Sequence, residues 1–479
     1  MSESLSLPVY LSSCKQKMLD LFIGASALLT TAVAVTTNVS ISDSVYPPSV
    51  ANLSQVLSPS TGTNGGQYYG PDVPKGSYGI YNYCNMPHVR KSEYVMPNDT
   101  NAKIKYVEII HRHHRRTTDN PFPYEVLDLN VSCRDFKEYN YEQPDNGIGA
   151  AAVYGRTYVN PVNQFSDMLY FSTSCQSGDL VLAGLEDSIR HGRDLYEVYG
   201  DMLGIIPQFP NDELTFFRTT PTTLTNQVAG GIIKGMFHGQ VDALKIYQQP
   251  SNFDSLAPDY SCPFADNIRD NYQNVPAWFE HLNETLDFQA NLSSILGVQG
   301  NSAWLTWYDH FFDTFSTRTC NLYPLPCNVT TGACVDADQA EQVFRLGDYE
   351  YNYIYNSAQN VTEYNAYHYG VWIGELLDNL GKAVNGTSSI QYRHNVAHDS
   401  SMAPLLGNLG ITFLRWPGLG SELSFELWES SGEYFMRVLY GGQPLQTTWG
   451  GALSWIPYEQ FASQMAPTFP SDIFTQCSS

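Results

Sequence analysis

The sequence predicts an α/β fold, a mixed central sheet flanked by helices, with helical material inserted between the parts of the sheet. Three observations favour it. The apolar run Ile104–Ile110 (IKYVEII) stops abruptly at polar residues, as a buried strand does at its end. The stretch Ser389–Ile411 (SIQYRHNVAHDSSMAPLLGNLGI) has the pattern of a strand, a loop and a helix. Near the end of the chain, LSFELWES and FMRVLYGG alternate like a hairpin around Ser430-Ser431-Gly432.

Between these strands, the apolar residues recur at the three- and four-residue spacing of helices. The predicted helices cover Ser188–Gly204, Thr222–Met236, Asn301–Phe315 and Tyr364–Leu380.

The composition is that of an acidic globular protein. The chain has 479 residues, 43% of them hydrophobic, and a formal net charge of −23. That length suits about two structural domains. An acidic surface repels nucleic acid and anionic membranes, so neither is expected as a partner, whereas it suits a protein that stays soluble in an acidic medium.

The first 34 residues predict a signal peptide. Two lysines precede an apolar run of about 15 residues, and Ala32-Val33-Ala34 has the form of a cleavage site. An uncleaved signal anchor is the alternative, although this run is shorter than the roughly 20 residues of a membrane span. No later segment is apolar enough to span a bilayer, so no membrane is expected for the mature form. Residues 35–75, rich in Ser, Thr, Gly and Pro, predict a flexible or wrapping extension.

The cysteines and the glycosylation sequons agree with secretion, to the cell exterior, the cell wall or a vacuole. One of the nine cysteines lies in the predicted signal peptide, and the other eight can form four disulfides. Cys327 and Cys334 are close enough to close a local loop. Nine sequons predict N-linked glycans. The eight cysteines are Cys84, Cys133, Cys175, Cys262, Cys320, Cys327, Cys334 and Cys477, and the sequon asparagines are Asn38, Asn52, Asn98, Asn130, Asn283, Asn291, Asn328, Asn360 and Asn385.

Six consecutive imidazole or guanidinium side chains, His111–Arg116, follow the first predicted strand. Open α/β sheets place ligands at the carboxyl ends of their strands. Arg112 and Arg116 can bind the oxygens of a phosphate bidentately, and His113 can act as a nucleophile that forms a covalent phospho-enzyme. The neighbouring guanidiniums disfavour protonation of His113, so we expect its pKa below the ordinary value.

A second pair, His398-Asp399, follows the later strand. If it meets the first block at one sheet edge, His398 adds a donor to the phosphoryl oxygens and a protonated Asp399 gives a proton to the leaving oxygen. We therefore expect this set to suffice for cleaving a small-molecule phosphate monoester without a metal or another cofactor.

These residues resemble a known family. Arg112–Thr118 (RHHRRTT) is similar to the RHGxRxP signature of the histidine acid phosphatases, and His398-Asp399 to their later HD pair. The flanks YNYCNMPHVRKSEYVMP, FRTTPTTLTNQVAGG and FELWES with RVLYGG resemble a fungal-type secreted subgroup. The resemblance implies hydrolysis through a phosphohistidine. It also implies an α/β core, residues 76–125, 215–245 and 340–479, and a smaller, mostly helical cap, residues 126–214 and 246–339.

Two departures from the family pattern stand out. His114 and Thr118 replace the Gly and the Pro of the signature. The family carries a third phosphate-binding arginine in an RxTxxxR segment, and here the second arginine of that segment is Leu224. Arg218 can take the role, or the neutral side chain of Asn226 or Gln227 can bind phosphate. Otherwise the phosphate clamp, Arg112 and Arg116, binds phosphate more weakly.

Other interpretations of the same residues stay open. The basic block can be a solvated face, and His111 and His113, with His398, can hold zinc in a metal-dependent hydrolase. His111 and Arg115, if strand alternation continues, point away from the pocket. A catalytically weak relative that binds phosphorylated ligands is a further possibility. His368 is expected to be a packing histidine. Because the chain has only ten lysines, a broad monoesterase is favoured over a phytase, and the oligomeric state is undetermined.

Overall fold

The computed structural model describes residues 45–58, 62–68, 79–123, 133, 137–140, 152–155, 162, 175–238 and 244–478. The predicted signal peptide, residues 1–34, lies outside the described residues, as do the sequons at Asn38 and Asn130. In the described part of the chain, no helix combines the length and the apolar character that crossing a membrane requires.

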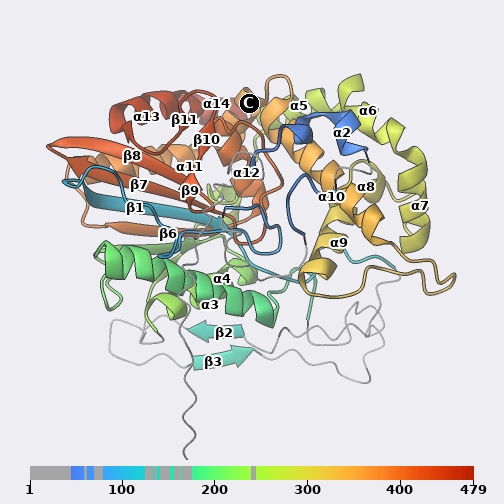
Figure 1. The fold of residues 1–479 in the computed structure, drawn as a ribbon, viewed down its shortest axis with the longest axis horizontal. Helices are drawn as coiled ribbons and strands as arrows, with labels where there is room; N and C mark the ends of the chain where they lie inside the picture. Colours follow the sequence, from blue (N-terminus) through green and yellow to red (C-terminus); the bar gives the residue numbers. More distant parts are fainter. Residues whose placement is uncertain are drawn as a thin grey trace, which may run out of the picture. The chain divides into compact units, whose positions relative to one another are not determined.

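An eight-stranded mixed sheet forms the centre of the fold, which confirms the predicted class (Figure 1). Its strand order is β12-β8-β7-β1-β6-β4-β5, with β9 paired to β8. The neighbours β1, β6, β4 and β5 are parallel, and β7 and β8 form the predicted antiparallel hairpin beside β1. The bounds are β1 Lys103–Arg112, β4 Thr215–Thr219, β5 Ile246–Tyr247, β6 Tyr392–Ala397, β7 Glu422–Ser430, β8 Glu433–Tyr440, β9 Gln443–Pro444 and β12 Ile456–Pro457.

Strand β1 is buried on both faces, which explains its nearly continuous apolar run. Tyr106 and Ile110 belong to one hydrophobic cluster, and Val107 and Ile109 belong to another on the opposite face. Successive side chains of a strand point to opposite faces, so each cluster takes every second residue.

Helices cover both faces of the sheet (Figure 1). Helices α3 (Leu182–Tyr196) and α4 (Thr223–Met236) pack against one another, and α4 and the end of α3 contribute to the cluster that contains Val107 and Ile109. Helices α11 (Val361–Val384), α12 (Asp399–Asn408) and α13 (Tyr458–Met465) contribute to the other cluster. The predicted helices at 188–204, 222–236 and 364–380 are therefore present, the first continuing as a π-helix, Glu197–Met202.

A second group of helices lies beside the sheet (Figure 1). It comprises α5 Pro263–Gln273, α6 Pro276–Glu284, α7 Leu286–Leu296, α8 Ser302–Leu305, α9 Asp309–Cys320 and α10 Ala337–Asn352, which continues as a π-helix, Tyr353–Ser357. The prediction of a single helix over residues 301–315 was wrong, because the chain breaks between α8 and α9. The backbone N–H of Tyr308, at this break, donates to both carboxylate oxygens of the buried Glu350 at 3.0 Å.

The remaining elements are short. They are the 3₁₀ turns Pro48–Ala51, Ser251–Phe253 and Ala466–Thr468, helices α2 Leu53–Val56 and α14 Ile473–Cys477, and strands β2 Lys137–Asn140, β3 Ala152–Gly155, β10 Gln446–Thr447 and β11 Gly451–Ala452. Helix α2 lies against α10, where Arg345 donates to the carbonyl oxygen of Val56, so this part of the predicted extension wraps onto the helical group.

The eight predicted cysteines form four disulfides, Cys84–Cys320, Cys133–Cys175, Cys262–Cys477 and Cys327–Cys334. The last one closes the predicted local loop. The first joins the segment before β1 to the end of α9, across 236 residues of sequence. Because a long loop is closed, this bond removes much conformational freedom from the unfolded chain.

Candidate active site

The carboxyl ends of three parallel strands meet at one edge of the sheet. Arg112, at the end of β1, is in register with Ala397 at the end of β6, and the N–H of His113 donates to the carbonyl oxygen of Ala397 at 3.0 Å. On the other side of β6, Thr219 at the end of β4 is in register with Val396. The expected convergence of the blocks at 111–116 and 398–399 is therefore present.

The ring of His113 is buried and faces the ring of His398, with 5.5 Å between the ring centroids. Nδ1 of His113 lies 2.9 Å from the carbonyl oxygen of His114. A carbonyl accepts and cannot donate, so Nδ1 carries the proton and Nε2 keeps its lone pair. The pKa of His113 is well below its ordinary value, chiefly because the ring is buried and then because of Arg112, Arg116 and His398. The sequence predicted the direction, and burial is the larger cause.

Arg112 is fully buried and anchored by neutral and charged partners. Its Nη1 donates to the hydroxyl of Tyr83 at 3.0 Å and to the carbonyl oxygen of Pro417 at 2.7 Å. Its Nη2 lies 2.9 Å from a carboxylate oxygen of Asp399. Its Nε is buried without a hydrogen-bond partner among the described residues. One donor of this guanidinium therefore remains for an acceptor such as a phosphate oxygen.

Arg116 has a similar arrangement with two carboxylates. Its Nη2 lies 2.5 Å from Asp119 and 3.0 Å from Asp313, and its Nη1 donates to the carbonyl oxygen of Thr117 at 2.7 Å. Within the part of the chain that the structure describes, its buried Nε also has no partner. Asp313, on α9, was not found from the sequence, because nothing near it in the sequence marks it as part of this site.

His398 and Asp399 lie where β6 gives way to α12. Nε2 of His398 is 2.9 Å from the hydroxyl of Thr220, and the pKa of His398 is lowered to about 4, mainly by burial. Asp399 accepts a hydrogen bond of 2.7 Å from Nε1 of Trp416. Burial raises the pKa of Asp399, but Arg112, this hydrogen bond, Arg116 and His398 together hold it below the ordinary value. Asp399 is therefore held as a carboxylate by Arg112 and Trp416.

Arg218 and Leu224 lie apart from these groups. Arg218 donates to Asp254 at 2.7 Å and to Glu375 at 2.6 Å, and it also contacts Gln249. Leu224 packs against the hydrophobic cluster of α3, α4 and the sheet. On this strand end, the hydroxyl of Thr220 is the group that contacts His398. Asn226 accepts hydrogen bonds from Thr219 and from Gln248, which occupies its carbonyl oxygen.

Behind the site, His114 enters a buried cluster of imidazoles that the sequence did not predict. Its Nε2 lies 3.2 Å from Nδ1 of His191, whose Nε2 donates to the buried carboxylate of Glu422 at 2.7 Å. The ring of His114 lies against Gly420, where a Cβ atom would come within 2.6 Å of it. This network fixes His114, which replaces the glycine of the RHGxRxP signature. It thereby also fixes the carbonyl group of His114, which orients the ring of His113.

His111 and Arg115 face away from His113, as expected. His111 contacts the carbonyl oxygen of Arg112 through Nδ1 and His394 through Nε2, and Arg115 forms an ion pair with Asp187 at 2.6 Å. The zinc set considered from the sequence is therefore divided, since His111 pairs with His394 while His113 faces His398. Among the residues that the structure describes, the histidines that lie close enough to share a cation are instead His111, His114 and His191, with their ligand atoms within 4.8 Å of one another.

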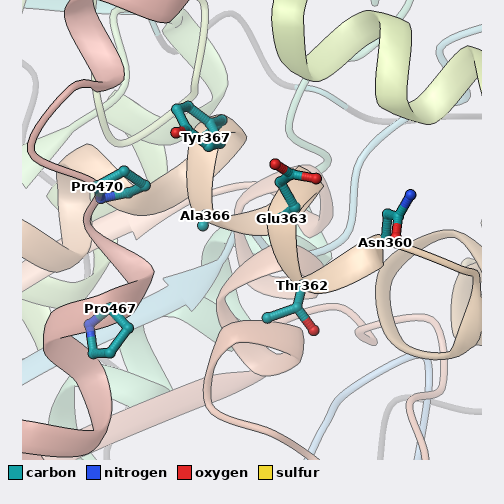
Figure 2. A pocket seen from close by; sticks show the side chains of 7 residues that line it. All are labelled: Asn360, Thr362, Glu363, Ala366, Tyr367, Pro467 and Pro470. Atoms are coloured by element: carbon teal, nitrogen blue, oxygen red, sulfur yellow. The ribbon is translucent and has the colours of Figure 1, made fainter.

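An open surface hollow lies between the start of α11 and the segment after α13 (Figure 2). Its lining residues are Asn360, Thr362, Glu363, Ala366, Tyr367, Pro467 and Pro470. None of the residues described above contributes to it, so we do not assign the chemistry to this hollow.

The fold and the family match described below define the class of this protein, a phosphomonoester hydrolase of the histidine acid phosphatase type. The chain belongs to the histidine phosphatase superfamily (branch 2), whose family model matches residues 103–441. Counting factor 60 of Dictyostelium discoideum is 24% identical over 377 residues, which cover 75% of this chain and 84% of that protein. The 2-phosphoxylose phosphatase 1 of Homo sapiens is 22% identical over 386 residues, 78% of this chain and 77% of that protein.

Among solved structures, the fold is similar to that of the Hafnia alvei phytase in complex with tartrate. The TM-score is 0.50 and the sequence identity 13%, and the match covers 78% of this chain and 99% of the phytase chain. At this identity the match concerns the fold alone.

Proposed function

We propose that this protein is a secreted acid phosphatase that hydrolyses phosphate monoesters through a covalent phosphohistidine on His113. The observation that carries the proposal is the hydrogen bond from Nδ1 of His113 to the carbonyl oxygen of His114. It leaves Nε2 of a neutral imidazole as the nucleophile, between the guanidiniums of Arg112 and Arg116. The four disulfides support the secretory location, because such bonds persist in oxidising compartments.

In the proposed reaction, Arg112, Arg116 and His398 bind the oxygens of the phosphoryl group. Nε2 of His113 attacks phosphorus, the bond to the leaving oxygen breaks, and that oxygen takes a proton from Asp399. Water then attacks the phosphohistidine, Asp399 takes a proton from the water, and inorganic phosphate leaves with His113 restored.

Asp399 must become protonated to act as the donor, although Arg112 holds it ionised in the free enzyme. A bound phosphate dianion reverses this balance in two ways. It competes for Arg112, and its negative charge disfavours a second anion nearby, so it raises the pKa of Asp399. In this proposal the substrate itself prepares its proton donor.

Arg218 does not bind phosphate in this proposal, because Asp254 and Glu375 already hold it. The clamp then has two arginines, and losing a charged hydrogen bond costs about 1.5–3 kcal/mol of phosphate binding. This favours, as a second candidate, a catalytically weak relative that binds phosphorylated ligands.

The deciding experiment compares wild type with His113→Ala and with the control His238→Ala, an exposed histidine. We expect wild type and control to hydrolyse p-nitrophenyl phosphate at acidic pH and to retain labelled phosphate after a rapid acid-free quench. His113→Ala should lose both, with a rate at least about 10³-fold lower. Hydrolysis that disappears with a chelator would favour a metal-dependent enzyme. A wild-type protein that binds phosphate but hydrolyses no monoester over roughly pH 3 to 7 would favour the binding function.

A further inference from the structure

The phosphate clamp is surrounded by more carboxylates than its two guanidiniums can neutralise. Arg112 is paired with Asp399, and Arg116 is paired with both Asp119 and Asp313. A fourth acid, Asp309 at the start of α9, pairs with Nδ1 of His310 at 2.9 Å, and its pKa is raised chiefly by burial, so we do not count it among the charges of the clamp.

The two partners of Arg116 differ in how firmly they are held. Asp313 is nearly buried, with 10% of its side chain exposed, and it accepts hydrogen bonds from the hydroxyl of Thr118 at 2.7 Å and the N–H of Asp119 at 2.9 Å. The side chain of Asp119 is 51% exposed, and its ion pair is with Arg116. A ligand that approaches Arg116 from solvent can therefore displace Asp119 at little cost, whereas displacing Asp313 breaks several buried contacts.

The charged groups around Asp119 come from three parts of the fold. They are Arg112 at the end of β1 and Arg116 in the loop after it, Asp313 from α9 and Asp399 from α12. The approach to the clamp is therefore lined with negative charge on the side of Asp119 and α9. A phosphate group gains the two guanidiniums on entering, but an additional anion on the leaving group, on this side of the clamp, is repelled by the carboxylates of Asp119 and Asp313.

We propose that Asp119 is a gating and specificity-determining carboxylate: it holds Arg116 until one phosphate group replaces it, and with Asp313 it selects singly phosphorylated substrates whose leaving group is neutral or cationic. This inference rests on the proposed phosphatase function and names its substrate class. Esters that carry several phosphates are disfavoured by the same charges.

The test uses three small monoesters whose leaving groups differ in charge: phosphoethanolamine (positive), glycerol 3-phosphate (neutral) and 3-phosphoglycerate (negative), with inositol hexakisphosphate as a polyanion. For wild type we expect kcat/KM to fall in that order, by about two- to fivefold per unit of charge, the range that exposed ion pairs give. In Asp119→Asn, the differences in kcat/KM between these esters should be smaller, mostly because the KM values become more alike. This variant should also bind inorganic phosphate more tightly in calorimetry, by a similar factor.

Two further variants separate the gate from general effects. Asp119→Glu keeps the charge and should restore the wild-type order. Asp378→Asn removes an exposed carboxylate that pairs with Lys382 on α11, and it should leave the series unchanged. If Asp119→Asn shows the wild-type order and the wild-type affinity for phosphate, the gate is wrong while the phosphatase function stands. If wild type hydrolyses none of these esters, nor p-nitrophenyl phosphate, the proposed function itself fails.

Discussion

Nε1 of Trp416 donates a hydrogen bond of 2.7 Å to the same carboxylate oxygen of Asp399 that Arg112 approaches to 2.9 Å. One carboxylate oxygen of Asp399, the proposed proton donor, thus accepts from both the indole N–H and the guanidinium, and both contacts stabilise the ionised form. The indole is itself fixed, since it stacks on Phe312 at 4.0 Å and on Tyr351 at 3.8 Å between ring centroids. The protonation of Asp399 therefore depends on Arg112 and, in addition, on Trp416, which no pattern in the sequence associates with the site.

Replacing Trp416 by phenylalanine removes this donor and keeps a ring between Phe312 and Tyr351. The pKa of Asp399 should then rise, because its ionised form loses a stabilising hydrogen bond. Where Asp399 must be protonated, the alkaline limb of the pH profile of kcat should move to higher pH, by about one unit. A profile measured on p-nitrophenyl phosphate checks this, and an alkaline limb that stays in place or moves to lower pH would contradict the role of Asp399 as the acid.

Replacing Arg218 by methionine should affect stability far more than substrate binding. Asp254 is fully buried, and without Arg218 its charge has lost its cationic partner, so we expect a loss of about 3 kcal/mol in the free energy of unfolding. The KM for p-nitrophenyl phosphate should change by less than about twofold. The double variant with Asp254→Asn should regain part of the stability in urea unfolding. A KM raised more than about tenfold at unchanged stability would instead make Arg218 a phosphate ligand.

The lowered pKa of His368 should make the free energy of unfolding depend on pH. Burial, and then Arg269, lower its pKa from 6.5 to about 3, and its ring stacks on Tyr364 at 4.9 Å. Between these pH values the unfolded chain binds a proton that the folded chain does not, so stability is lost as pH falls from about 6.5 towards 3. His368→Phe should match wild type near pH 7 and exceed it by about 1–2 kcal/mol near pH 4.5 in urea unfolding. Equal stabilities at both pH values would contradict a neutral His368 in the folded chain.

The sequons are not equivalent in the folded chain. Asn328 is buried, its amide donates to the carbonyl oxygen of Ser294 at 3.1 Å, and its side-chain oxygen accepts from the N–H groups of Thr330 and Thr331. The other sequon asparagines in the described part of the chain are exposed, among them Asn360 at the edge of the hollow in Figure 2.

We therefore expect glycans at the exposed sequons and an unmodified Asn328. Enzymatic deglycosylation in heavy-oxygen water, followed by peptide mass spectrometry, distinguishes the sites. The exposed asparagines of the same protein are the internal control: Asn52, Asn98, Asn283, Asn291, Asn360 and Asn385. Substantial modification of Asn328 would mean that the loop around it differs from the one described.

The edge of the sheet that carries the proposed active site was predictable because its signals are local. Two apolar runs end in basic or histidine-containing blocks, and parallel strands bring their carboxyl ends together, so His113 and His398 could be placed at one edge from residue order alone. The direction of the pKa shift of His113 followed from its neighbours in the sequence. The division into a core and a cap, with its predicted boundaries, stays a prediction.

What the sequence did not reveal depends on contacts between distant segments. Asp313 reaches Arg116 from a helix almost 200 residues later, and Glu422 reaches His191 from a separate strand. Acidic residues are common and carry no pattern that indicates such a partner. The break before α9 depends on Glu350, which is equally distant in sequence. The ionised state of Asp399 in the free enzyme follows from Trp416 and Arg112 together, and the sequence suggested only its possible protonation.

The disulfide between Cys84 and Cys320 joins two segments, and each of them carries a residue that contacts one arginine of the clamp. Cys84 follows Tyr83, whose hydroxyl accepts a hydrogen bond from Arg112. Cys320 is the last residue of α9, the helix that carries Asp313, the ion-pair partner of Arg116. We therefore expect the proposed activity to depend on oxidative folding, because a chain made in a reducing cytosol has the same side chains but lacks the covalent bond between their supports. Production hosts and storage buffers should be chosen with that dependence in mind.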